Sequence, residues 1–443
     1  MKHKSDKTNI KAALTIATAA LLGTNGLVHA ESTANAEANT WEFDSAFLFY
    51  SEVDRVSAGE AIINAKKTFE NEEVLNLKLT IDTLTGASAN GAVAQPTVQT
   101  FTRPSGNGQY SIASGDVPLD DTFHDTRVQL NAQWTQPIAS NYTVSGGVHL
   151  SKEYDYLSLG VNGNVAIDFD RKNSTFSAGF SYFQDTFTPE GGIPKPFTSM
   201  LVGDSSTPSW DDSFAQTRLG SEDDKTTADI LLGFTQVINR RMLMQFNYSY
   251  SMVDGYLTDP FKVLSQVDNT GVAQDYIYEA RPDSRIKQSI YAQSLYHFDK
   301  SVLDISYRYM WDDWEIDSHT IDTRFRIPLG DSFGTESYLQ PHFRFYQQSA
   351  ADFYMPFMVV DESVDNNLLP EFASADYRIG EMTAYTIGLK YGLLVNNGHE
   401  LSFRLEYYRQ APTDAGFDAP GILKDVDLYP TIDAIIAQVT YSF

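Results

Sequence analysis

The last residues of the chain alternate between two kinds of side chain. Counted back from the C-terminus, every second residue is apolar or aromatic, and those between are polar apart from Ile436; the first set is Ile435, Ala437, Val439, Tyr441 and Phe443. A period of two predicts a β-strand, and a polar second face predicts a strand between hydrocarbon and a wet lumen. An edge strand of a soluble sandwich is the alternative.

Segments of this kind recur along the chain, and no amphipathic helix is predicted. A transmembrane strand needs about 9 to 11 residues. Sixteen candidates follow one another: Phe43 to Glu52, Glu60 to Phe69, Glu73 to Leu84, Thr126 to Gln136, Tyr142 to Lys152, Tyr154 to Asp168, Ser174 to Thr186, Lys225 to Val237, Arg241 to Val253, Arg285 to His297, Ser301 to Trp311, Trp314 to Ile327, Glu336 to Ser349, Ile379 to Leu394, His399 to Gln410 and Ile432 to Phe443. They predict an all-β fold, a single closed antiparallel transmembrane β-barrel of about 16 strands; 14 and 18 remain open.

The connections between these segments differ in length. Short turn-like links alternate with long polar loops rich in Gly, Pro and Asp; the long ones are Gly86 to Asp125, Phe187 to Asp224, Asp254 to Ser284, Ala350 to Arg378 and Ala411 to Thr431. Short periplasmic turns opposite long extracellular loops are typical of outer-membrane barrels. We therefore expect both termini in the periplasm and one barrel domain over 31–443.

Strand parity predicts which side chains face the lumen. In Ser301 to Trp311, Asp304, Ser306 and Arg308 share one face, and Arg on lipid at mid-depth costs about 2–4 kcal/mol, so this face points inward. Applied to the other strands, parity gives these lumen or constriction candidates: Lys78, Asp82, Arg127, Asp304, Arg308, Asp322, Arg324, Arg326, Arg344, Arg404 and Glu406, together with Asp229, Lys390 and Glu400. Two interpretations remain open: opposed acidic and basic bands across a pore, or paired charges that fill a closed lumen.

The N-terminal 30 residues have the pattern of an export signal. Four Lys precede a short apolar stretch, and Val28, His29 and Ala30 precede the expected cleavage site, so residues 1–30 are predicted to be removed and the mature chain to begin at Glu31. No other run of 18 apolar residues follows, so no transmembrane helix is predicted.

Composition narrows the classes of function. The chain has no Cys, which excludes disulfides and Cys-ligated metal centres in this chain. Of 32 basic and 58 acidic residues, the signal segment holds four Lys and one Asp, leaving 28 and 57 and a net charge near −29. Such a polyanion is a poor candidate for nucleic-acid binding. We expect a place in the outer membrane of a Gram-negative bacterium, with the lipid bilayer and lipopolysaccharide as partners. We interpret the acidic loops as a solvated surface; divalent cations joining them to lipopolysaccharide are the alternative.

No enzyme or metal motif is found in the sequence. The six His beyond the signal occur in neither GxSxG nor HExxH spacing, and the acidic loop clusters lack EF-hand spacing. His319 shares a face with apolar Ile321, and we interpret these His as interfacial or rim residues. No catalytic residue, metal or cofactor is therefore predicted.

Four short segments carry resemblances to known proteins. The terminal Phe resembles the C-terminal strand by which outer-membrane barrels are recognised, which implies that Tyr441 and Phe443 form an insertion signal for the barrel-assembly machinery. The segment from Tyr50 to Arg55 and two others resemble a domain-of-unknown-function family of proteobacterial outer-membrane proteins over the whole mature chain. The residues of those two that carry it, with no known role, are Asp82, Thr85, Gly86, Ser88, Asn90 and Gly91, and Glu153, Tyr154, Asp155 and Tyr156; Ala89 stands where Pro is expected.

The resemblance implies a function only loosely. Such proteins are often encoded beside a periplasmic flavin transferase, which suggests a flavin or redox protein as partner. The leading hypothesis is a channel or porin-like barrel with a charged lumen. The alternatives are a structural conduit for a periplasmic flavin or redox partner, and a membrane-embedded hydrolase.

Overall fold

The computed structural model describes residues 39–332, 335–360, 369–395, 398–413 and 416–443. The predicted signal segment, 1–30, lies outside these residues and stays a prediction. Among the described residues, no helix is both long and apolar enough to cross a membrane.

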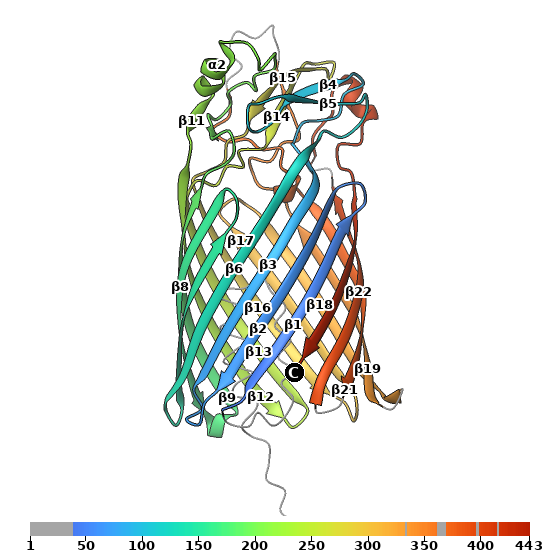
Figure 1. Cartoon of the computed structure of the whole chain (residues 1–443). Helices are drawn as coiled ribbons and strands as arrows, with labels where there is room; N and C mark the ends of the chain where they lie inside the picture. The colour runs from blue at the N-terminus through green and yellow to red at the C-terminus, as the bar shows by residue number, and fades with distance from the viewer. Residues whose placement is uncertain (1–38, 333–334, 361–368, 396–397, 414–415) are drawn as a thin grey trace, which may run out of the picture.

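Within the described residues, sixteen antiparallel strands close into one barrel (Figure 1). Each predicted segment corresponds to one strand, so the predicted fold and strand number are confirmed. In barrel order, the strands are β1 (Trp41–Glu52), β2 (Val56–Thr68), β3 (Val74–Ala89), β6 (Leu119–Ala139), β7 (Tyr142–Lys152), β8 (Tyr156–Phe169), β9 (Ser174–Phe187), β12 (Asp223–Asn239), β13 (Met242–Gly255), β16 (Ser284–His297), β17 (Val302–Asp312), β18 (Asp317–Ser332), β19 (Thr335–Gln348), β21 (Met382–Val395), β22 (His399–Pro412) and β23 (Ile432–Ser442).

The first and last strands close the barrel. β1 pairs with β23 from Asp44 opposite Ser442 to Glu52 opposite Ala434. The backbone amide of Phe443 donates to the carbonyl of Phe43 at 2.8 Å, and the two rings stack with centroids 5.3 Å apart. The terminal Phe thus completes the closing seam, while its role as an insertion signal stays a prediction.

The barrel exterior is apolar, as the strand parity predicts. On β22, Phe403, Leu405 and Tyr407 are exposed, and on β17 Ile305 and Tyr307 are exposed. In water, this many exposed apolar side chains on one sheet would be unfavourable. A belt of this kind fits the hydrocarbon core of a bilayer.

The long loops fold into a structure of their own at the end of the barrel away from the C-terminus (Figure 1). We call it the cap: residues 90–118, 188–222, 256–283, 349–360, 369–381 and 416–431. It contains β4 (Gln99–Thr102) with β5 (Gln109–Ile112), β10 (Ile193–Pro194) with β11 (Arg218–Gly220), β14 (Val263–Val267) between β15 (Ala273–Tyr278) and β20 (Met358–Val359), and the helix α2 (Trp210–Gln216).

The cap has an apolar interior, which the sequence interpretation of polar loops missed. Phe101 and Leu264 are fully buried in separate clusters that join residues from several loops. A third cluster packs Trp314, from the β17–β18 turn, against Phe353. A short helix of seven residues, α2, also forms here with Trp210 buried.

Candidate functional site

The first motif segment runs from β3 into the cap. Two of its residues are glycines for backbone reasons: Gly86 has φ +135°, and a Cβ there would lie 2.3 Å from the carbonyl oxygen of Arg55. Gly91 has φ +96°, and its Cβ would lie 2.5 Å from the carbonyl oxygen of Val263. Side chains other than Gly are strained in this region of φ. Both glycines allow two backbones to approach closely.

Hydrogen bonds of Asn90 connect the same segment to the cap. Its side chain is buried; Nδ2 donates to the Tyr110 hydroxyl at 3.0 Å, and Oδ1 accepts from the amide of Ala92 at 2.9 Å. Its carbonyl accepts from the amide of Val263 at 2.8 Å. Thr85 is exposed on β3, and Ser88 pairs with Asp120 of β6. This motif therefore connects barrel and cap.

The second motif segment forms the short turn between β7 and β8. The side chains of Asp125, Glu153 and Asp155 offer oxygens that all lie within 4.8 Å of one another, a spacing that a metal ion could use. Tyr154 is largely exposed, and the Tyr156 hydroxyl donates to Asp185. Carboxylates thus gather at the loop-side rim of the barrel.

Burial raises the pKa of the Glu153 carboxyl to about 7, and the hydrogen bond and negative charge of Asp125 add to the rise, while Arg127 opposes it. Burial also raises the pKa of Asp155, again assisted by Asp125. The positive charge near Glu153 and Asp155 does not offset the effects of burial and of Asp125 on their ionised forms. A bound cation would favour the ionised form.

The two motifs meet in one cavity between the cap and the strand ends. It has a volume of about 680 Å³ and is lined by Ser88, Asn90, Glu153, Tyr154, Asp155 and Tyr156, among others. Ten carboxylates and five Lys or Arg side chains line it. The cavity is therefore acidic, and it gives the motif residues a common location.

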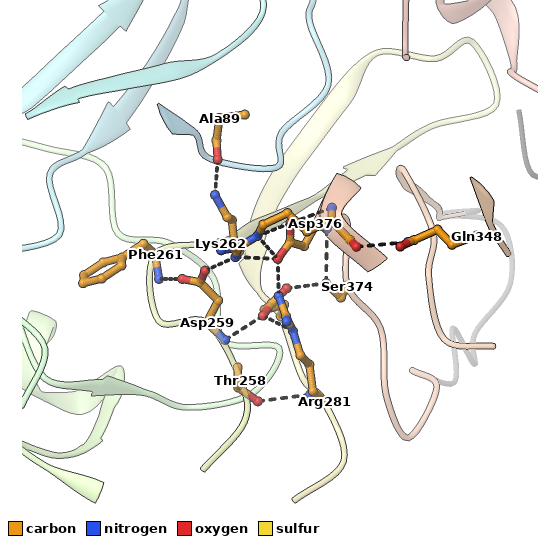
Figure 2. A network of polar contacts seen from close by, with 11 residues as sticks. Ala89, Thr258, Asp259, Phe261, Lys262, Arg281, Gln348, Ser374 and Asp376 are labelled. Atoms are coloured by element: carbon orange, nitrogen blue, oxygen red, sulfur yellow. Dashed lines mark hydrogen bonds and ion pairs between the residues drawn. The ribbon is translucent and has the colours of Figure 1, made fainter. Parts of the chain in front are cut away.

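A buried network of charges forms part of the cavity lining (Figure 2). Asp376 is buried, with side-chain oxygens 2.7 Å from Arg281 and 2.5 Å from Arg378. Arg281 also lies 2.6 Å from Glu279, and Arg378 pairs with Asp259. The network joins the β13–β16 loop to the β19–β21 loop.

Lys262 links this network to the first motif. Its Nζ donates to the carbonyl of Ala89 (Figure 2). The acceptor is a backbone carbonyl, which a Pro at this position would also have. The Ala that stands at position 89 in place of the expected Pro therefore leaves the contact unchanged.

Burial alone would raise the pKa of Asp376, but Arg378 and Arg281 outweigh it and hold that pKa far below its usual range. The ionised Asp376 carboxylate therefore stabilises the folded cap at any pH above the ordinary carboxyl pKa. This contribution is lost only as the pH falls through the depressed pKa of Asp376.

Inside the barrel, charged side chains and one His from β18, β19 and β22 meet across the lumen face. We call this group the wall cluster: Asp322, Arg324, His342, Arg344, Arg404 and Glu406. His342 lies at its centre, with Nε2 3.1 Å from Asp322 and Nδ1 2.7 Å from Glu406. Arg324 lies 3.4 Å from Asp322, Arg344 lies 4.0 Å from it, and Arg404 lies 3.7 Å from Glu406. Acid and base alternate along one wall and do not form opposed bands.

The remaining predicted lumen residues lie around this cluster or across the barrel. Arg326 lies over the Tyr338 ring at 3.7 Å and 4.0 Å from Glu400, which also pairs with Lys390 at 3.3 Å. Asp304 accepts from Gln293 at 2.7 Å, and Asp229 accepts from Ser181 at 2.8 Å. On β3 and β6, Asp82 pairs with Arg127 at 2.8 Å, and Lys78 shares the face of Asp82. Arg308 lies over the Tyr291 ring at 5.6 Å.

A family model with the description "Protein of unknown function (DUF3570)" matches residues 11–443. The chain belongs to this family. Membership confirms the resemblance drawn from the two motif segments, and in this DUF3570 protein those segments are the ones that meet at the cavity. The flavin transferase neighbourhood stays a prediction.

Solved structures with a similar barrel include three outer-membrane proteins. A bacterial polysaccharide outer membrane secretin gives a TM-score of 0.43 at 8% identity, over 92% of this chain and 100% of that one. Pseudomonas putida OprB gives a TM-score of 0.39 at 9% identity, over 92% of this chain and 94% of that one. Pseudomonas aeruginosa OpdK gives a TM-score of 0.36 at 8% identity, over 91% of this chain and 98% of that one. These values are too low to carry an argument about function. No curated protein matches significantly.

Sequence reasoning missed several of the charged residues of this DUF3570 protein. His342 is a lumen residue, not a rim residue as interpreted; the signal was available, because it shares the parity of Arg344 on β19. Arg281, Glu279 and Asp376 lie in loops without periodicity, so nothing in the sequence marks them as buried. Asp185 pairs with Tyr156 at the cavity, a contact between strands that only the fold reveals.

Proposed function

We propose that this protein is an outer-membrane channel whose charged lumen sets its solute preference. The observation that carries the proposal is a closed barrel of sixteen strands with an apolar exterior and ionisable side chains inside. Barrels of about 16 to 18 strands are wide enough to leave an aqueous channel, whereas about eight strands are filled by side chains.

Two lumen side chains support a hydrated interior. Arg308 and Arg344 are on the inward face of β17 and β19, yet both are exposed to solvent. Both side chains therefore border open space in the lumen. The cap covers the loop end, so we infer that the cap controls which solutes enter.

Channel activity is favoured over enzymatic activity. In the described part of the chain, His side chains form hydrogen bonds with Asn131, Tyr307, Asp322, Glu406 and Tyr441. Among the described residues, none of these bonds joins a His to a Ser, as a hydrolase pair would require. A Gram-negative outer membrane, lipopolysaccharide and the barrel-assembly machinery are the environment and partners we propose; a periplasmic flavin or redox protein as partner stays a prediction.

We expect Arg308→Glu to shift ion selectivity toward cations. The change alters the lumen by two charges; at about 10 Å in water this is worth about 0.8 kcal/mol, and screening at 0.1 M salt reduces it severalfold. The K⁺ to Cl⁻ permeability ratio should therefore rise about twofold, measured as a reversal potential across a bilayer in asymmetric KCl.

The matched control is Arg241→Glu, the same substitution in an exposed turn at the opposite end from the cap. It should leave the reversal potential unchanged. Equal shifts in both variants, or none in Arg308→Glu, would show that ions do not pass Arg308.

A further inference from the structure

We infer that the cavity beneath the cap is a binding site for an organic cation that carries two or more amino groups. This deepens the proposed channel function by naming a solute class, and it rests on that function only for the route of the solute. Binding itself can be measured without conduction.

The charge of the lining points to a cation. Three of the five cationic side chains, Lys262, Arg281 and Arg378, are already engaged by the buried network and by Ala89. Arg103 and Lys225 lie near Asp120 and Asp185. Five other carboxylates of the lining make no ion pair with any described residue: Asp125, Asp155, Glu190, Asp223 and Asp224. A surplus of unpaired carboxylates in a concave site concentrates cations.

Aromatic rings form another part of the lining. The Phe187 ring lies 6.0 Å from Tyr156, 6.4 Å from Tyr256 and 6.3 Å from Phe261. The ammonium group of Lys225 already lies over the Tyr156 ring at 5.1 Å. Aromatic faces attract ammonium groups and contact their alkyl carbons. This wall suits an alkylamine better than a hydrated metal ion.

Two buried oxygens of the lining lack hydrogen-bond donors. Asp185 is 7% exposed, and its Oδ1 has no hydrogen-bond partner among the described residues, although Oδ2 accepts from Tyr156. The buried hydroxyl of Tyr256 likewise has no partner there. Leaving such acceptors unpaired costs about 1–3 kcal/mol each. Both oxygens have almost no exposed surface, so an amine in the cavity reaches them only if neighbouring side chains of the lining shift.

The size of the cavity separates this ligand from a bare metal ion. At about 680 Å³ it lies in the range of small-molecule sites. A metal ion held by Asp125, Glu153 and Asp155 would occupy one corner and would leave the aromatic wall unused. An extended diamine or triamine contacts both.

The test is calorimetric titration of spermidine into the purified full-length barrel in detergent at 0.15 M salt. The variant is Glu153→Gln/Asp155→Asn, whose two half-buried sites lie in the β7–β8 turn at the loop end of the barrel, and folding is checked by heat-modifiable gel migration. We expect affinity to fall about tenfold or more, since two charge-assisted contacts are lost. The matched control, Asp211→Asn/Asp212→Asn, removes two charges from α2, outside the cavity lining, and should bind as the wild type does.

The outcomes are distinct. Equal weakening in both double variants, or no spermidine binding to the wild type, would overturn the inference. Binding of Ca²⁺ but not spermidine, lost in Glu153→Gln/Asp155→Asn, would also overturn it and assign the site to a metal. Spermidine binding to a barrel that conducts no ions would uphold the site and refute the proposed channel.

Discussion

Replacing Asp376 by Ala should destabilise the cap by about 3 kcal/mol while the barrel stays folded. Removing one partner of a buried ion pair costs about 3–5 kcal/mol because the other charge is left buried and unpaired. The lower end applies here, since Arg281 keeps Glu279 and Arg378 keeps Asp259. Cap opening should become roughly 150-fold more frequent.

Hydrogen exchange of two amides measures this directly. The amide of Ala280 donates to the carbonyl of Ala373 at 3.0 Å, and the amide of Ala373 donates to the carbonyl of Ala280 at 2.9 Å. These two bonds connect the two loops that Asp376 joins. Exchange of both amides should accelerate in Asp376→Ala, and amides of β22 should not change. The control is Asp299→Ala, which breaks an exposed pair with Arg241 in a turn at the other end. Unchanged exchange at Ala280 and Ala373 would mean that the buried network does not hold the cap.

The second large effect concerns the lipid-facing surface. Ile305→Arg should lower the free energy of unfolding by about 2–4 kcal/mol, because Arg at mid-depth on the exterior must leave water for hydrocarbon. Ile305 is exposed near the middle of β17. Urea titration of the barrel folded into lipid vesicles gives the value.

The neighbouring position supplies the control. Ser306 faces the lumen and pairs with Asp322 in the register of β17 and β18. Ser306→Arg places the same charge among carboxylates and water, and we expect a much smaller change. A larger loss in Ser306→Arg than in Ile305→Arg would reverse the assignment of inside and outside.

The strands could be predicted because lipid and lumen impose one rule on every spanning residue. The prediction is less accurate beyond the membrane-spanning residues. The sequence predicts a strand from Thr126 to Gln136, but β6 begins at Leu119. The additional residues lie at the loop end, where β6 pairs with β3 up to Ala89, the residue just before the cap begins. Alternation is no longer required there.

The cap and the cavity could not be predicted for a different reason. Phe101 and Leu264 are buried by contacts between loops far apart in sequence, and isolated apolar residues carry no period. Asn90 and Glu153 were singled out as motif residues, but only the fold places both at one cavity. The lumen charges, by contrast, follow from parity alone, although their pairing along one wall does not.

Single-channel recording of the folded, heat-modifiable barrel in planar bilayers shows whether the lumen conducts ions. We expect discrete conductance steps for the wild type, with larger or more frequent openings in Asp376→Ala because the cap is loosened. A folded barrel that stays silent in both forms would contradict a water-filled passage through the lumen.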